Sequence, residues 1–176
     1  MKTKKNTMKV IPFKNYILML LMFIAVVLIA LYLFKWYQVK SDEKVSKSYL
    51  IKNNLVTNSV TTFEELDDVL TENSSRLILY ISYRNSHRIY NIEKKYKDLF
   101  QDYNLQEIFT LFDITNIKED NKNYNKLIND FLDINVTGYP VVIYFENGQI
   151  SSYKKINSYK DLERIIKKYN IEKNSH

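Results

Sequence analysis

The chain has no cysteine among its 176 residues, and it has only two histidines, two glycines and two prolines. Without a thiol it cannot form disulfides, iron–sulfur clusters or thiolate metal sites, and it cannot use a cysteine nucleophile. Two glycines are too few for a glycine-rich phosphate-binding loop, and two histidines form no zinc site without carboxylate ligands. We therefore expect neither a cofactor nor a metal.

Most of the chain also lacks an excess of either charge. The net charge is +6, but residues 1–14 contain five lysines and no acid, and residues 35–47 contain four lysines and two acids. The remaining residues, 48–176, hold 17 basic and 18 acidic side chains. The positive charge thus belongs to two short flanks. Because the rest of the chain has no basic excess, we expect no nucleic-acid partner.

A long run without charge separates the two basic flanks. It reads NYILMLLMFIAVVLIALYLF and covers residues 15–34. A helix of about 20 residues spans roughly 30 Å, which matches the hydrocarbon thickness of a bilayer. Tyr16 at one end and Trp36 and Tyr37 at the other suit the two membrane interfaces. The sequence predicts a transmembrane helix over residues 15–37, in contact with the lipid bilayer.

A cleaved signal peptide is the alternative interpretation of this run. Signal peptides have a shorter apolar region, about 7–15 residues, and end in a small-x-small site. Here the run ends in LYLFKWY, and we favour an uncleaved anchor. The tail at residues 1–14 carries more lysine than the flank at 35–47, so the positive-inside rule places it in the cytoplasm and the C-terminal part outside.

Residues 38–61 are polar and contain neither glycine nor proline. We predict a stalk or linker there, with at most one short strand near Leu55 and Val56. A folded domain is expected to follow over residues 62–172.

Helix and strand signals alternate regularly from Thr62 onward. T-F-E-E at residues 62–65 has the pattern of a capping box, and Ser158 with Asp161 has the same spacing. Apolar periodicity predicts helices over 63–70, 88–101, 124–131 and 158–169. Apolar runs predict strands over 76–83, 108–114, 140–146 and 149–156, the last two joined by the hairpin dipeptide Asn147-Gly148.

The resulting order is α-β-α-β-α-β-β-α. Strand–helix–strand units imply parallel pairing with right-handed crossovers, and the final hairpin is antiparallel. The sequence therefore predicts a mixed sheet between helices, an α/β sandwich preceded by one N-terminal transmembrane helix.

Two segments resemble the two halves of the thioredoxin fold. RLILYISYRNSHRIYNIEKKY, residues 76–96, is similar to the strand that runs into the active-site helix. VTGYPVVIYFENGQI, residues 136–150, is similar to the V-x-G-x-P element, strand and turn of the second half. The resemblance implies a thioredoxin-like fold and a cis peptide bond before Pro140. Within that fold the chain is most similar to membrane-anchored thioredoxin-like bacteriocin transport accessory proteins of Gram-positive bacteria.

The resemblance places the two family cysteines at Ser86 and Ile89. The C-x-x-C motif therefore reads Ser86-His87-Arg88-Ile89, and Tyr80 stands where thioredoxin has a buried, proton-shuttling aspartate. Neither cysteine position holds a thiol, so thiol–disulfide exchange is excluded chemically. A fold can persist without its reaction, and we expect a redox-inactive protein that is not an enzyme.

The resemblance also implies a peptide-binding groove, because in this fold the residue before the cis-proline offers its main chain to an extended partner. The residues expected there are Tyr83, Asn85, Ser86, His87, Thr137, Tyr139 and Pro140. We expect a peptide or protein client at the extracytoplasmic membrane surface, in the context of bacteriocin export or immunity. The alternative is a structural docking subunit of a membrane complex that does not use the groove.

Two groups of side chains near the groove carry weaker signals. Ser86 and His87 could form a nucleophile and its base, but no orienting acid is evident, and we interpret Ser86 as a helix N-cap. Arg84, His87 and Arg88 could bind an anion or an acidic partner at a helix start. We favour a solvated basic turn instead.

Carboxylates and glycosylation sequons complete the candidates. The acids Asp113, Glu119, Asp120, Asp130 and Asp133 lack the alternating spacing of a calcium loop, and we interpret them as a solvated acidic face. Asn73 and Asn135 begin Asn-x-Ser/Thr sequons, which matter only in a glycosylating host.

Overall fold

The computed structural model describes residues 12–72 and 75–174. It separates into two units, which divide between Glu43 and Lys44. Asn73 and Ser74, which belong to the first sequon, lie outside the described residues, as do residues 1–11 of the basic tail.

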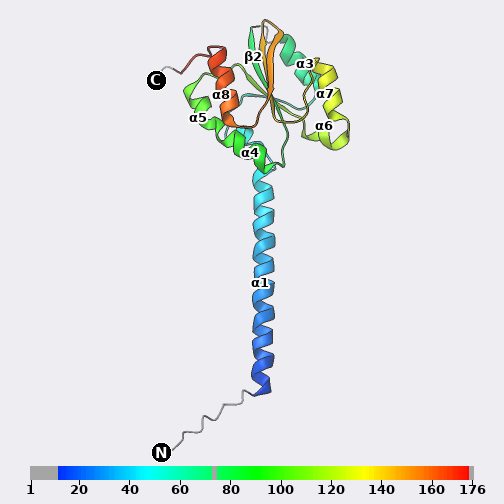
Figure 1. The fold of residues 1–176 in the computed structure, drawn as a ribbon, viewed down its shortest axis with the longest axis vertical. Helices are drawn as coiled ribbons and strands as arrows, with labels where there is room; N and C mark the ends of the chain where they lie inside the picture. Colours follow the sequence, from blue (N-terminus) through cyan, green and yellow to red (C-terminus); the bar gives the residue numbers. More distant parts are fainter. Residues whose placement is uncertain (1–11, 73–74, 175–176) are drawn as a thin grey trace, which may run out of the picture. The chain divides into compact units, whose positions relative to one another are not determined.

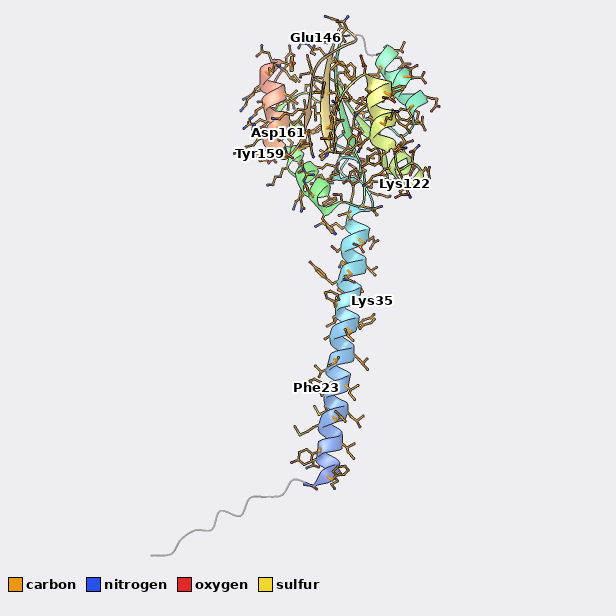
Figure 2. The ribbon with its side chains drawn as sticks, turned by 45° about the vertical axis from the view of Figure 1, so that its right-hand side comes forward. Phe23, Lys35, Lys122, Glu146, Tyr159 and Asp161 are labelled. Carbon is orange, nitrogen blue, oxygen red and sulfur yellow. The ribbon has the colours of Figure 1, made fainter. Side chains whose placement is uncertain are left out.

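Helix α1 (Phe13–Val45) contains the whole charge-free run. It is long and apolar enough to cross a membrane by length and composition. Its side chains, Phe23 and Lys35 among them, project outward along the helix (Figure 2), and the Phe23 side chain is 67% exposed. The helix extends beyond the predicted span of residues 15–37 at both ends.

Residues 38–61 differ from the predicted stalk. Helix α1 continues to Val45, a short helix α2 (Tyr49–Lys52) follows, and strand β1 (Asn58–Val60) begins after it. β1 lies three residues beyond the strand expected near Leu55 and Val56, which instead pack as loop residues against the core. The folded unit therefore starts at Lys44, well before residue 62.

The folded unit is built on a five-stranded mixed sheet with the strand order β1-β3-β2-β4-β5. β1, β3 and β2 pair in parallel, whereas β2 with β4 and β4 with β5 are antiparallel. The other strands are β2 (Arg76–Ser82), β3 (Phe109–Asp113), β4 (Val141–Glu146) and β5 (Gln149–Lys155). The antiparallel turn between β4 and β5 has Asn147 at φ 52° and Gly148 at φ 72°, the left-handed pair of a type I′ turn.

Helices cover both faces of this sheet (Figure 1). On one face lie α3 (Phe63–Glu72), α6 (Thr115–Asp120) and α7 (Tyr124–Leu132). On the other lie α4 (His87–Lys94), α5 (Tyr96–Asp102) and α8 (Tyr159–Lys168). This arrangement confirms the predicted thioredoxin-like α/β sandwich.

Strand β2 is buried on both of its faces, which explains why helices pack on both sides of the sheet. Leu77, Leu79 and Ile81 pack into the core beneath α3 and α7. Ile78 and Tyr80 pack into the second core, toward α4, α5 and α8. Strand side chains alternate between faces, so a strand buried on both sides is apolar throughout. Each fully buried side chain of this kind contributes roughly 1.5–3 kcal/mol to folding.

Local signals set most helix ends. Glu65 accepts hydrogen bonds from the Thr61 and Thr62 N–H groups, and its own N–H donates to Thr62 Oγ1, as the predicted capping box requires. The cap formed by Ser158 and Asp161 is also confirmed. The helix predicted over 88–101 is instead two helices, because Lys95 donates to the Ile92 carbonyl three residues back and tightens the turn there.

Candidate functional site

Ser86 and Ile89, at the family's cysteine positions, have structural roles here. Ser86 is the N-cap of α4, and its Oγ accepts a hydrogen bond of 3.4 Å from the Ile89 N–H. The Ile89 side chain is only 2% exposed and belongs to the core. Asn85, which precedes the cap, has φ 61° and donates its N–H to the Val45 carbonyl at 3.0 Å. The N-cap interpretation of Ser86 is confirmed.

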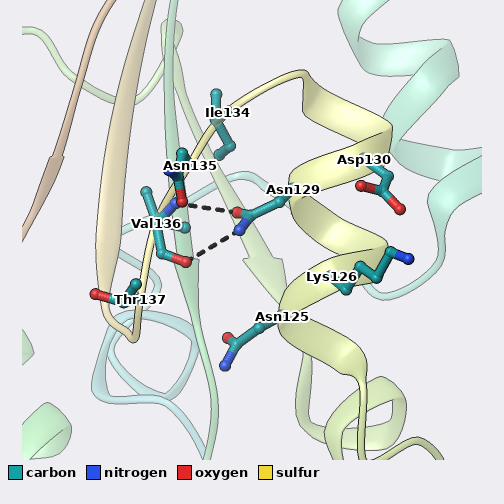
Figure 3. A pocket seen from close by; sticks show the side chains of 8 residues that line it. All are labelled: Asn125, Lys126, Asn129, Asp130, Ile134, Asn135, Val136 and Thr137. Carbon is teal, nitrogen blue, oxygen red and sulfur yellow. Dashed lines mark hydrogen bonds between the residues drawn. The ribbon is translucent and has the colours of Figure 1, made fainter.

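A loop facing α4 leads into β4 and is held at both of its ends. At its start, Asn129 on α7 bonds both main-chain groups of Val136, donating to the carbonyl at 3.1 Å and accepting from the N–H at 3.2 Å (Figure 3). At its end, the Ile156 N–H donates to the Pro140 carbonyl at 2.8 Å. The Tyr139–Pro140 peptide bond is cis, as the resemblance implied.

The main chain between these two anchors is unpaired. The N–H and C=O groups of Thr137 and Gly138, and the N–H of Tyr139, have no hydrogen-bond partner among the described residues. Thr137 is exposed, Gly138 is half-buried and Tyr139 is buried, so the stretch is open to solvent at Thr137. Gly138 has φ 131°, a conformation that residues with a Cβ rarely adopt.

The Tyr139 side chain points away from this exposed stretch. It is 4% exposed, and its ring centroid lies 5.9 Å from that of Tyr124. Its hydroxyl is buried without a hydrogen-bond partner among the described residues, and burial raises the pKa of this phenol well above its usual range. Tyr139 therefore contributes its main chain, and not its ring, to the groove.

Arg88 joins the first turn of α4 to the loop. Its Nη1 donates to the Tyr139 carbonyl at 3.4 Å, and its Nη2 donates to the Ile156 carbonyl at 3.2 Å and to Asn157 Oδ1 at 3.3 Å. The sequence predicts Arg88 in a solvated basic turn, and the side chain is indeed exposed, but it also bonds to the cis-proline loop. The sequence placed Arg88 inside the degenerate motif but gave no sign of which main-chain groups it would reach.

Arg84, in contrast to Arg88, is half-buried and paired with an acid. Its Nε lies 2.9 Å from Asp113 Oδ2, and Asp113 is buried at the end of β3. The same carboxylate accepts a hydrogen bond of 3.0 Å from the Thr115 N–H. The sequence predicts a solvated acidic face that includes Asp113, and this is wrong for Asp113, because β3 ends inside the core and the carboxylate is buried.

The remaining predicted groove residues lie around this junction. Tyr83 is half-buried beneath Lys118, whose Nζ is 3.3 Å from the ring centroid. His87 and Asn85 are exposed at the start of α4. Because Arg88 bonds to the Tyr139 carbonyl, the start of α4 and the cis-proline loop are in contact.

A cleft of about 480 Å³ opens beside the loop (Figure 3). Its lining comes from α7 and from the segment before Gly138, and comprises Asn125, Lys126, Asn129, Asp130, Ile134, Asn135, Val136 and Thr137. Asn135, the acceptor of the second sequon, is exposed there. Because Thr137 is one of the lining residues, the cleft adjoins the unpaired main chain of Thr137.

A buried carboxylate lies under the other side of α4, and sequence reasoning missed it. Glu93 is 1% exposed and accepts hydrogen bonds from Ser48 Oγ at 2.7 Å, the Tyr49 N–H at 2.7 Å and Ser82 Oγ at 3.3 Å. Burial raises its pKa to about 6, although these hydrogen bonds oppose the rise. Glu93 thus attaches the segment before α2 to α4 and β2.

The chain contains no thiol, so the positions of Ser86 and Ile89 cannot exchange disulfides. Within residues 12–72 and 75–174, no three histidine, aspartate or glutamate side chains lie together in a way that could hold a metal ion.

No protein-family model matches the chain, and no curated protein matches it in sequence. Among solved structures, a thioredoxin h mutant from poplar has a TM-score of 0.49 at 18% identity, over 65% of this chain and 82% of its own. Reduced thioredoxin from Schistosoma mansoni has a TM-score of 0.48 at 16% identity, over 65% and 96%. Thioredoxin from Fasciola hepatica gives 0.48 at 16%, over 64% and 98%.

Proposed function

We propose that this chain is a membrane-anchored, redox-inactive thioredoxin-like protein that binds a peptide or protein client outside the cytoplasm. The observation that carries the proposal is the unpaired main chain from Thr137 to the Tyr139 N–H. A strand-like client can pair with such groups without any thiol chemistry.

The same stretch sets the order of magnitude of the binding free energy. In the part of the chain that the structure describes, five main-chain groups lack partners, of which those of Thr137 are the most exposed, and a main-chain hydrogen bond contributes about 0.5–1.5 kcal/mol net. Association also costs several kcal/mol in lost translational and rotational freedom. Main-chain pairing alone is therefore weak, and the client must gain affinity from side-chain contacts in the adjoining cleft or along α4.

The membrane anchor is part of the proposal. Helix α1 has the length and composition of a span, and the lysine excess at residues 1–14 favours a cytoplasmic N-terminus. The client-binding unit then lies at the extracytoplasmic surface. The resemblance to bacteriocin transport accessory proteins suggests a role in bacteriocin export or immunity.

A steric block at the open stretch tests client binding. The Thr137→Trp variant of the full chain, stabilised with its partner by brief crosslinking and purified from its own host, is expected to lose the client. Thr137 is exposed, so the larger side chain does not enter the core. Gln101→Trp, at an exposed position on α5, is the control and should retain the client. Equal recovery with both variants would contradict use of the groove.

The alternative is a docking subunit that leaves the groove unused. One observation favours it: Leu127 and Phe131 on α7 are 40% and 39% exposed and form an apolar outer face. If this face docks a membrane complex, Leu127→Ser with Phe131→Ser should release the complex, and Thr137→Trp should not.

A further inference from the structure

We propose that the groove selects clients with an acidic segment, whose carboxylates pair with Arg88 and Lys155. This inference rests on the proposed client binding and specifies the chemistry of the client. It follows from the charges that border the unpaired main chain of residues 137–139.

Arg88 holds a charge that its neighbours do not neutralise. Its three acceptors, two main-chain carbonyls and the Asn157 amide oxygen, are all neutral, and the distances are 3.2–3.4 Å. Hydrogen bonds from a guanidinium to a carboxylate are shorter, about 2.7–2.9 Å. Arg84 shows the contrast in the same molecule, with its Nε 2.9 Å from the Asp113 carboxylate. Among the described residues, no carboxylate forms an ion pair with Arg88.

Arg88 can accept a carboxylate without leaving its present contacts. A guanidinium carries five N–H donors, and the three hydrogen bonds here come from its two terminal nitrogens. The side chain is exposed, so the remaining donors are open to a ligand.

Lys155 borders the loop at Gly138. At the end of β5, its Nζ lies 3.1 Å from the position that a Cβ would take on Gly138. The side chain is exposed, and within the described part of the chain no carboxylate forms an ion pair with it. Two cations therefore border the open main chain, Arg88 at Tyr139 and Lys155 at Gly138.

Asp161, which bonds to the main chain of Asn157, does not cancel this charge. Asp161 at the start of α8 accepts from the Asn157 and Ser158 N–H groups, each at 3.0 Å. Its carboxylate lies 2.8 Å from Lys154 Nζ and 3.4 Å from Arg164 Nη1. Burial acts to raise its pKa, but the hydrogen bonds from Lys154, Asn157 and Ser158 outweigh it, so the pKa is lowered. Asp161 is therefore an ionised group already shared between two cations.

The first turn of α4 adds to the positive potential. It contains no acidic residue, and the exposed Arg88 lies in it. The N-terminus of a helix also carries a partial positive charge. A client with carboxylates near its pairing segment gains from this potential, whereas a basic client is repelled.

The test is selection of peptides from a displayed random library by the full chain in nanodiscs of phosphatidylcholine, a neutral lipid. We expect the selected peptides to be enriched in aspartate and glutamate relative to asparagine and glutamine. The Arg88→Gln, Lys155→Gln double variant should lose this enrichment. Lys122→Gln removes an exposed charge on the opposite face of the sheet, across from Asp161 (Figure 2), and should retain it.

A selected acidic peptide then gives the size of the effect. Each charge removed should weaken its binding by up to about fivefold, the range of an exposed ion pair. Binding to the unmodified chain should also weaken as salt rises, because salt screens exposed charges. This salt dependence needs no variant, so it remains decisive if the double variant folds poorly.

The outcomes separate the two proposals. Neutral peptides whose selection is lost in Thr137→Trp would overturn the acidic preference and leave client binding in place. Acidic peptides that bind the double variant equally well, or independently of salt, would also overturn the preference. Failure to select any peptide would overturn both.

Discussion

Because the Glu93 carboxyl is buried, its contribution to the unfolding free energy of the folded unit should fall as pH rises. Glu93→Gln keeps the shape of the side chain and removes its titration. The amide oxygen can accept from Ser48 Oγ and the Tyr49 N–H, as one carboxylate oxygen does now. The amide NH₂ then faces Ser82 Oγ, which can act as an acceptor.

The magnitude follows from the pKa of this one group. Burial raises the pKa of Glu93 from its usual 4.5 to about 6, so the folded state holds the proton more tightly than the unfolded state. Below the unfolded pKa both states are protonated, and the stabilising contribution is fully present. As pH rises through 4.5 toward 6, the unfolded state ionises first and this contribution is lost. The loss is about 2 kcal/mol of unfolding free energy, since one pKa unit corresponds to about 1.4 kcal/mol.

Guanidinium unfolding of the full chain in a neutral detergent, followed by the near-ultraviolet circular dichroism of the buried tyrosines, measures this effect. The unfolding free energy of the unmodified chain minus that of Glu93→Gln should fall by about 2 kcal/mol between about pH 4 and pH 7.5. The same subtraction with Glu107→Gln, at an exposed position, should change by less than about 0.5 kcal/mol. A difference for Glu93→Gln that stays constant with pH would refute the reasoning from burial.

Four further predictions follow from the same structure. Ser48→Ala removes a hydrogen-bond donor to ionised Glu93, so it should lower the unfolding free energy by about 1.5–3 kcal/mol at neutral pH. The loss should be smaller at about pH 4, where Glu93 is protonated. An equal loss at both pH values would be inconsistent with a charge-assisted hydrogen bond. Tyr139→Phe removes a buried hydroxyl without a partner among the described residues, so the unfolding free energy should stay unchanged or rise by up to about 1 kcal/mol in the same assay. Ser86→Cys with Ile89→Cys should form an intramolecular disulfide on oxidation, detected by mass, and a persistent dithiol would argue against the assigned motif positions. Protease added to intact cells should degrade the C-terminal unit, and survival of that unit until lysis would reverse the proposed topology.

Local patterns predicted much of the fold because they act over short distances. The apolar run at 76–83, the Asn147-Gly148 dipeptide and the Ser158–Asp161 cap each correspond to the element expected of them. These signals depend on backbone sterics and nearest-neighbour hydrogen bonds, which the sequence contains in full. The cis bond before Pro140 could not be predicted from these local signals, and its prediction came from the resemblance to thioredoxin.

Long-range contacts explain what sequence reasoning missed. β1 has only three residues and depends on its partner β3, about fifty positions away, so residues 38–61 had the pattern of a stalk. Glu93 lies four residues after Ile89, on the apolar face of α4, but the sequence does not show that Ser48 and Tyr49, about 45 positions away, bond its carboxylate. The inward direction of the Tyr139 ring and the reach of Arg88 depend on how the loop meets α4.

Photocrosslinking in the native host tests the central claim, client binding at the groove, most directly. The probe replaces Thr137, since the Tyr139 side chain is buried, and a second probe replaces the exposed Lys167 on α8 as the control. We predict one dominant partner, identified by mass spectrometry, from position 137 and none from position 167. A partner captured only from position 167, with none from position 137, would contradict the account and indicate a docking scaffold whose groove is unused.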